Sequence, residues 1–398
     1  MRTDFIGLRV ARWRDIGGMT QQQLADAIGV TREYVSMIEN GRRPITKRSL
    51  LIAIGQALGV SISELTGQPR EPESAEELVV SSIESGVRTA LDEDSDEMLP
   101  ADVSQVAVAV RRVRVARMAC DFPTLAALLP ELITRARSLA SDGHGAHARV
   151  GLAAFVAAAT DAAFTVKAHG HVDLAARLAE AAQRAAVELG EPAEIAAGAF
   201  AVAQCALAGG ARRKSLRVVS EAADALGDDG DDASLTWYGM LHLHAALSAA
   251  ALGRADDVAP HLAEAEATAM RVVDDPWLQE LTATNVGIWR VAIALENGEP
   301  DRAPQYARRV DRSKIRGVDR RAHLHVDTGR GLYAAGQFDE AVREFLRADD
   351  LAPQKVRSRP WVLELVGQMV RDAPSRGGSD ELRELAARCR MDPLTEPT

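Results

Sequence analysis

Cysteine is scarce in this chain, and the three cysteines, Cys120, Cys205 and Cys389, lie far apart in its 398 residues. Their number is odd and none belongs to a Cys-x-x-Cys pair, which argues against a disulfide framework and against a zinc knuckle. We expect all three to be small buried apolar residues.

Aromatic residues make up only 4% of the chain, whereas hydrophobic residues make up 47%. The core is therefore expected to consist of helices that pack closely through Ala, Leu and Val. No apolar run approaches the roughly 18–20 residues that span a bilayer, and the first ten residues, MRTDFIGLRV, lack the apolar segment of a signal peptide. We expect a cytoplasmic protein with no membrane partner.

Signatures of catalysis and of metal binding are also missing. The chain has no P-loop, Gly-x-Ser-x-Gly, His-Glu-x-x-His or dinucleotide fingerprint. Residues two apart on a helix point about 200° apart, so a His-x-His pair there cannot chelate one ion, and His144 and His147 have no third ligand near them in the sequence. We expect no cofactor, no metal and no enzymatic activity. The three His-x-His pairs are His169 with His171, His242 with His244, and His323 with His325.

Charge is distributed unevenly along the chain. Residues 1–66, which we call the head, contain nine Lys and Arg and six Asp and Glu, a net charge of +3. The rest of the chain keeps 38 of the 47 basic and 51 of the 57 acidic residues, a net charge of −13. A basic head on an acidic body fits a protein that touches nucleic acid at one end only.

The head contains two short helical segments with clear start and stop residues. Thr20 is a natural N-cap for QQQLADAI, residues 21–28, and Thr31 caps REYVSMIEN, residues 32–40. Gly29 makes the turn between them. Val35 and Ile38 share one face of the second helix. With helices before and after this pair, the pattern predicts a five-helix helix-turn-helix domain whose second helix of the pair enters the DNA major groove.

The stretch MTQQQLADAIGVTREYVSMIENGRR, residues 19–43, resembles the phage-repressor/Cro class of helix-turn-helix domain, also called the xenobiotic-response-element family. The resemblance covers about residues 5–66 and implies a DNA-binding regulator of transcription. It also implies a structural ion pair between Arg14 and Glu39. The matching elements are Thr20-Gln21, Leu24-Ala25, Gly29-Val30-Thr31, Val35, Ile38 and Glu39-Asn40-Gly41.

The resemblance also implies roles for the polar residues of the head. Four residues opposite Val35 and Ile38 would reach base edges, where Arg suits guanine, Glu can accept from cytosine and Met can pack on a thymine methyl. Glu33 departs from the more usual Gln or Arg, so the target sequence is not implied. The base-reading residues would be Arg32, Glu33, Ser36 and Met37, and the phosphate-binding residues would be Gln21, Asn40, Arg42, Arg43 and Lys47.

A linker follows the head. TGQPREPES, residues 66–74, holds two prolines, and AEELVVSSIESGVRTAL, residues 75–91, is expected to form an amphipathic helix. The acidic stretch DEDSDEMLPAD, residues 92–102, is expected to be a solvated loop. We therefore expect three ranges: a helix-turn-helix domain at 1–66, a linker with one helix at 67–102 and a helical-repeat domain at 103–398.

Glycines recur with a period near forty in the third range. Their spacings of 40, 43, 45 and 38 residues predict an α-solenoid of about six helical hairpins. Residues 322–353 strongly resemble a tetratricopeptide repeat, residues 119–133 look like an early copy in which Asp121 replaces the turn glycine, and DELRELAARCR looks like a terminal cap. The turn glycines are Gly170, Gly210, Gly253, Gly298 and Gly336.

The tetratricopeptide pattern implies an inner wall built from the first helix of each hairpin. From this wall we select six ligand-binding candidates: Gln204, His244, Asn285, Trp289, Asp327 and Arg330. The other residues that the pattern places on the wall are Arg111, Asp161, Phe164, Lys167, His323 and Tyr333.

The architecture resembles cytoplasmic regulators of Gram-positive bacteria that sense peptide pheromones, and actinobacterial regulators with helical-repeat tails. By this resemblance we expect a homodimer that binds a palindromic double-stranded DNA operator and senses a small-molecule or peptide effector with its repeats. The dimer contacts would come from the repeats or from the C-terminal cap. The alternative is an interaction scaffold whose repeats bind a partner protein and whose helix-turn-helix is a docking or vestigial module.

Overall fold

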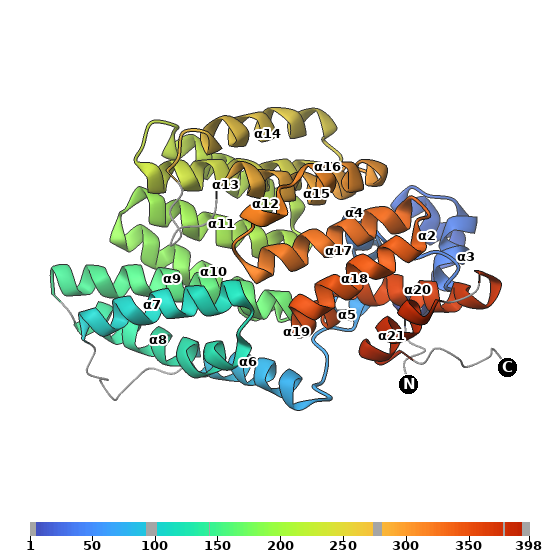
Figure 1. Ribbon diagram of the computed structural model, residues 1–398, viewed down its shortest axis with the longest axis horizontal. Coiled ribbons are helices and arrows are strands. Elements are labelled where there is room, and N and C mark those ends of the chain that lie inside the picture. Colours follow the sequence, from blue (N-terminus) through green and yellow to red (C-terminus); the bar gives the residue numbers. More distant parts are fainter. Residues whose placement is uncertain (1–4, 93–101, 143, 274–280, 377–378, 392–398) are drawn as a thin grey trace. The chain divides into compact units, whose positions relative to one another are not determined.

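The computed structural model describes residues 5–92, 102–142, 144–273, 281–376 and 379–391. Throughout these ranges the chain forms helices joined by short turns, and they contain no strand (Figure 1). The expected all-α fold class is confirmed, with five short helices first and paired long helices after them.

The five-helix head expected from the sequence is confirmed. Its core is closed by Leu24, Ala25, Val35 and Ile38, each at most 2% exposed. The helices are α1 (Ile6–Ile16), α2 (Gln21–Ile28), α3 (Arg32–Glu39), α4 (Arg48–Leu58) and α5 (Ile62–Thr66).

Six helical hairpins follow within the described residues, preceded by the single helix α6 (Ala75–Asp92). Consecutive helices of a hairpin pack on each other, as α9 does on α10 and α13 on α14. The hairpins pair α7 (Val103–Ala119) with α8 (Phe122–Asp142), α9 (Ala146–Ala168) with α10 (Val172–Leu189), α11 (Pro192–Ala208) with α12 (Arg212–Leu226), α13 (Asp232–Ala251) with α14 (Ala255–Ala269), α15 (Ala283–Glu296) with α16 (Ala303–Arg309), and α17 (Val318–Ala334) with α18 (Phe338–Leu351). The remaining elements are η1 (Pro300–Arg302), η2 (Arg312–Lys314), α19 (Pro353–Arg357), α20 (Pro360–Arg376) and α21 (Asp380–Arg388).

The recurring glycines are the hairpin turns, as their spacing predicts. All five have a positive φ, between 73° at Gly253 and 94° at Gly170, a conformation that costs other L-residues energy because of their Cβ atom. The first hairpin corrects one expectation. Cys120, and not Asp121, takes the left-handed conformation there with φ of 57°, while the Asp121 carboxylate accepts a hydrogen bond from the Thr124 N–H at 3.1 Å and so caps α8.

Small side chains fill the repeat core, as the scarcity of aromatics predicts. Along α10, Ala175, Ala179, Ala182 and Ala186 are all 0% exposed, which lets neighbouring helices approach closely. All three cysteines are free thiols. Cys205 and Cys389 are buried as expected, whereas Cys120 is only partly buried because it occupies a turn.

The described chain divides into two compact units. Unit 1 comprises Met1–Arg70, Arg290–Asp311 and Arg321–Thr398, and unit 2 comprises Glu71–Trp289 and Arg312–Arg320. This division differs from the three ranges expected from the sequence, since α6 buries Ile83 and Val87 against α8 and so belongs to the repeat core. Residues 93–101 of the expected acidic loop lie outside the described residues.

One helix corrects the expectation that no apolar run is long enough for a bilayer. α9 has 23 residues with a mean hydropathy of 1.4 over its best window, enough to cross a membrane by length and composition alone. Its alanines, valines, leucine and phenylalanines produce this value, and 67% of that window is buried within the protein, as in a core helix.

The turn glycines give a direct test of the hairpin design. Gly253 has φ of 73° and free space around its missing Cβ, whereas Gly209 has φ of −78° and room for a methyl group. Gly253→Ala is expected to lower the free energy of unfolding by about 1 kcal/mol through backbone strain alone. Gly209→Ala is the control and is expected to be neutral or slightly stabilising. Thermal unfolding of both variants checks this, and equal melting temperatures would contradict it.

Candidate nucleic-acid interface

Local capping builds the two central helices of the head. Thr20 and Gln23 form a reciprocal capping box, in which the Thr20 hydroxyl accepts from the Gln23 N–H and the Gln23 side chain accepts from the Thr20 N–H at 2.8 Å. Gly29 turns the chain with φ of 72°. The Thr31 hydroxyl then accepts the Tyr34 N–H at 3.2 Å and starts α3. Each start signal expected from the sequence is therefore confirmed.

One face of α3 is fixed by the core, so the opposite face is presented to solvent. Val35 and Ile38 are 1% and 2% exposed. Arg32 and Glu33, in the first turn of α3, are exposed, and Ser36 and Met37 are partly exposed. The structure thus brings the four expected base-reading residues onto one accessible surface.

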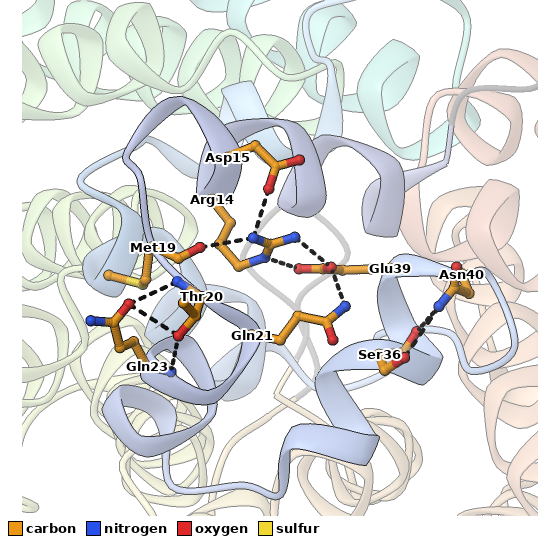
Figure 2. Close-up of polar contacts among 9 residues, drawn as sticks. All are labelled: Arg14, Asp15, Met19, Thr20, Gln21, Gln23, Ser36, Glu39 and Asn40. Carbon is orange, nitrogen blue, oxygen red and sulfur yellow. Dashed lines mark hydrogen bonds and ion pairs between the residues drawn. The ribbon is translucent and has the colours of Figure 1, made fainter.

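An ion pair ties the start of α2 and the end of α1 to the end of α3 (Figure 2). The Arg14 guanidinium donates to both oxygens of Glu39, at 2.6 and 3.0 Å, and Glu39 is only 6% exposed. The hydrogen bond to Glu39 is the main reason that the pKa of Arg14 is raised. The structural pair implied by the family resemblance is confirmed.

Gln21 is a partner of this ion pair. Its side-chain amide donates to the second Glu39 oxygen at 2.8 Å, as Figure 2 shows. The amide group expected at a DNA phosphate is therefore already engaged with Glu39. The Gln21 side chain remains partly exposed at the start of α2.

The other expected phosphate-binding residues follow α3. The Asn40 amide donates to the Ser36 carbonyl oxygen at 2.8 Å and so ends the helix (Figure 2). Arg43 lies over the Tyr34 ring, with its guanidinium carbon 4.9 Å from the ring centroid. Arg42, Arg43 and Lys47 are all exposed. These cations lie between the end of α3 and the start of α4.

Two helices of the head lack caps of their own, and the C-terminal helices of unit 1 supply them. The N-cap residues of α1 and α4, Phe5 and Lys47, make no side-chain capping bond. Instead, the Glu364 carboxylate of α20 accepts the Ile6 N–H at 3.1 Å, and the Glu296 carboxylate of α15 accepts the Arg48 N–H at 3.2 Å. A carboxyl oxygen is well suited to this position because the first N–H groups of a helix have no acceptor within the helix.

Two arginines from the repeats complete the attachment within unit 1. Arg330 donates to the Thr46 carbonyl oxygen at 3.0 Å and lies 3.6 Å from Glu296. Arg371 donates to the Gly41 carbonyl oxygen at 3.2 Å, and its guanidinium carbon lies 4.4 Å from the centroid of the Phe5 ring. None of these contacts involves Arg32, Glu33, Ser36 or Met37, so the attached head keeps that face free.

Two of the six ligand candidates, Asp327 and Arg330, lie where the head is attached within unit 1. Asp327 and Arg330 are 6% and 8% exposed and pair with each other at 3.0 Å. Arg330 also contacts Glu296, the Thr46 carbonyl oxygen of the head and the Trp361 ring, with its guanidinium carbon 5.4 Å from the centroid of that ring. Sequence reasoning missed Glu296, Glu364 and Arg371, since no local pattern marks a residue that caps a helix some 250 or more positions away.

The other four ligand candidates lie in unit 2, where three of them share one interior. His244 and Trp289 lie 5.5 and 6.4 Å from the Phe200 ring, measured between ring centroids. Asn285 is 0% exposed and lies against Met240, with its amide nitrogen 3.9 Å from the Met240 sulfur. Gln204 is partly exposed, and its side-chain oxygen accepts from the Lys167 ammonium at 2.8 Å.

Two of these side chains differ in how their polar atoms are satisfied. The His244 Nε2 atom lies 3.0 Å from the Ser215 hydroxyl, inside the protein. The Trp289 indole N–H has no hydrogen-bond acceptor among the described residues, although Trp289 is only 6% exposed. A buried donor without an acceptor is costly. An acceptor on a bound molecule would satisfy this group.

Comparison with known proteins supports the assignment of the head. Residues 10–65 match the helix-turn-helix family. A search of curated protein sequences gave no match.

Similar solved structures contain helical repeats. A Rap protein solved with the competence and sporulation factor has a TM-score of 0.50 at 10% identity, over 89% of this chain and 99% of that one. PlcR of Bacillus thuringiensis, solved with the peptide PapR7 and DNA, has a TM-score of 0.31 at 10% identity, over 97% of this chain and 92% of that one. ComR of Streptococcus suis has a TM-score of 0.33 at 14% identity, over 92% of this chain and 94% of that one.

Fold and site together define the class of protein. The chain carries a Cro/C1-type helix-turn-helix domain followed by a tetratricopeptide-like repeat domain.

The buried ion pair gives a stability prediction. Glu39→Ala removes the acceptor that Arg14 and Gln21 share, while Arg14 keeps its contacts to Asp15 and to the Met19 carbonyl oxygen. It is expected to destabilise the head by about 1–3 kcal/mol. Asp26→Ala is the control, because Asp26 is exposed and bonds only Gln22 of its own helix, and it is expected to change stability by less than about 0.5 kcal/mol. Urea unfolding followed by circular dichroism measures both, and a Glu39→Ala value as small as the control would refute the structural role.

Attachment of the head is expected to depend on pH through Glu364. Burial is the main reason that the pKa of Glu364 is raised, so the attached state binds this proton more tightly than an unfolded chain does. The contribution of Glu364 to stability therefore grows as the pH falls through its folded pKa towards the ordinary glutamate value, and it is lost as the pH rises.

Glu364→Gln tests this dependence, because the amide oxygen can still accept the Ile6 N–H while the charge is removed. The melting temperature of Glu364→Gln should exceed that of the wild type by most at pH 8, and the difference should shrink towards pH 5. Glu340→Gln, at an exposed position of α18, is the control. A difference that is constant with pH at Glu364 would show that burial does not perturb this carboxyl.

Proposed function

We propose that this protein is a homodimeric, sequence-specific regulator of transcription that acts in the cytoplasm. It binds a palindromic DNA operator with α3 of each head and changes its operator affinity when its repeat domain binds a small molecule or a peptide. The observation that supports this best is the accessible face of α3, carried by a domain that matches the helix-turn-helix family.

The chemistry of the side chains of the head assigns some of them to base edges and others to backbone phosphates. Arg32, Glu33, Ser36 and Met37 read base edges, because they share the outward face of the helix that enters the groove. Arg42, Arg43 and Lys47 bind backbone phosphates and set the register. Asn40 and Gln21 act beside them, and Gln21 reaches a phosphate by exchanging its bond to Glu39 or through water.

A palindromic operator requires two heads at a fixed separation. Half-sites one helical turn apart place the two α3 helices about 34 Å from each other. The repeats or the C-terminal cap supply the dimer contacts in this proposal.

The effector site is proposed at the interior of unit 2, on Gln204, His244, Asn285 and Trp289. The buried Trp289 indole N–H supports this, because a ligand oxygen would be its acceptor. Asp327 and Arg330 act in the attachment of the head, so they take part in the response to the effector and not in its recognition.

Helix α15 links the proposed effector site to the head. It carries Asn285 and Trp289 in its first half and ends at Glu296, which caps α4 of the head. The seven residues from Trp289 to Glu296 span about 10 Å of helix. In this proposal the effector binds one state of the repeats more tightly than another, and this differential affinity is sufficient to change the affinity for the operator.

DNA selection from random duplexes with the full-length protein tests this function. We expect an enriched inverted repeat for the wild type. Recovery of no enriched motif would favour the interaction scaffold, whose repeats bind a partner protein and whose head does not read DNA. An enzymatic activity is not part of the proposal.

Variants of the head separate sequence reading from phosphate binding. Arg32→Ala and Met37→Ala should each relax preference at one base position, at a cost of about 1–3 kcal/mol on the selected operator for the arginine. Arg42→Ala should weaken binding to all duplexes about equally and reduce the salt slope of log K by about 1. Titrations of selected and scrambled duplexes at several salt concentrations measure both effects. An Arg42→Ala change confined to the selected sequence would contradict the assigned roles.

A further inference from the structure

A strongly basic segment lies outside the head. Residues 302–321, the basic segment, contain eight Lys and Arg and only two Asp and Glu, a net charge of +6. The other 378 residues carry 39 basic and 55 acidic residues, a net charge of −16. Seven of the eight cations are exposed: Arg302, Arg308, Arg309, Arg312, Lys314, Arg316 and Arg321.

Residues 302–311, which include α16, and Arg321 are the part of this segment that belongs to unit 1. Arg309 makes no hydrogen bond or ion pair with any described residue. Arg308 donates through Nε to the Pro304 carbonyl oxygen of its own helix at 3.2 Å. Arg302 pairs with Glu299 at 3.2 Å and keeps an exposed side chain. The fold of α16 does not depend on these charges, because its buried contacts come from Ala303, Pro304 and Ala307.

The turn just before this segment lies beside a head residue assigned to DNA phosphate. A Cβ placed on Gly298, in the turn that leads from α15 to α16, would lie 2.6 Å from the Lys47 ammonium nitrogen. The Arg48 N–H, one residue on, is bonded to Glu296 of α15. Lys47 is thus a neighbour, within unit 1, of the turn that lies four residues before the basic segment.

The dimensions of α16 match the spacing of DNA charge. Its seven residues, Ala303–Arg309, extend about 10 Å. One strand of a duplex carries a phosphate about every 3.4 Å of axis, so a helix of this length lies alongside roughly three phosphates.

We propose that Arg302, Arg308 and Arg309 of the repeat domain form a second DNA contact, which binds phosphates that flank the half-site read by α3. The contact recognises duplex backbone and not sequence. It rests on the proposed function, because it requires that the head bring DNA to this side of unit 1. It extends the phosphate surface of Lys47 onto the repeats, so the repeat domain takes part in DNA binding directly.

The double variant Arg308→Gln/Arg309→Gln tests this contact. The matched control, Arg213→Gln/Arg217→Gln, removes two exposed arginines of α12 in unit 2. Each protein is titrated with two duplexes, one that ends at the edges of the operator selected by the wild type and one that adds ten base pairs on each side. Circular dichroism melting of each variant establishes that it is folded.

Loss of two phosphate contacts reduces the slope of log K against log salt by about 2 and weakens binding roughly ten- to a hundredfold at 0.1 M salt. We expect this loss for Arg308→Gln/Arg309→Gln on the long duplex, little change on the short one, and wild-type behaviour of the control on both. An equal affinity of wild type and variant for the long duplex would overturn the second contact while leaving the proposed function intact. A wild type that selects no duplex would overturn both.

Discussion

The structure depends on two helix ends that the head cannot satisfy by itself. α1 begins after Phe5 and α4 after Lys47, and neither residue caps its helix. The carboxylates of Glu364 and Glu296 do so from the repeats. Each of these buried carboxyl groups accepts an N–H that has no acceptor within its own helix, so the head and the C-terminal helices of unit 1 are held together. These contacts leave the outward face of α3 exposed.

Contacts between residues close together in the sequence could be predicted, and contacts between distant residues could not. Thr20, Gly29 and Thr31 act on backbone groups two or three residues away, and the turn glycines act at their own positions, so pattern alone predicts these features. The attachment of the head joins residues some 250 to 360 positions apart in the sequence, and nothing near Glu296 or Glu364 indicates their partners.

The ligand candidates also depend on contacts that the sequence pattern does not predict. The tetratricopeptide pattern assigns polar residues to an inner wall, but it does not say whether a neighbour already uses them. Asp327 and Arg330 hold each other and the head, and His244 is bonded to Ser215 inside unit 2. Trp289 differs because its indole N–H has no acceptor among the described residues. The sequence shows the positive charge of the basic segment at 302–321. The structure adds that the turn before this segment lies beside Lys47, and this neighbour is the reason for assigning the segment to DNA phosphates.

Amide hydrogen exchange of the full-length protein, with and without its selected operator, tests the central claim most directly. The account predicts that the Ile6 and Arg48 amides, which Glu364 and Glu296 accept, exchange slowly in both states. The amides of residues 32–43, most of which are already hydrogen-bonded in and after α3 in the free protein, should exchange still more slowly when DNA is bound. Fast exchange at Ile6 and Arg48 in the free protein, or exchange at residues 32–43 that the operator does not slow, would contradict an attached head with an open reading face.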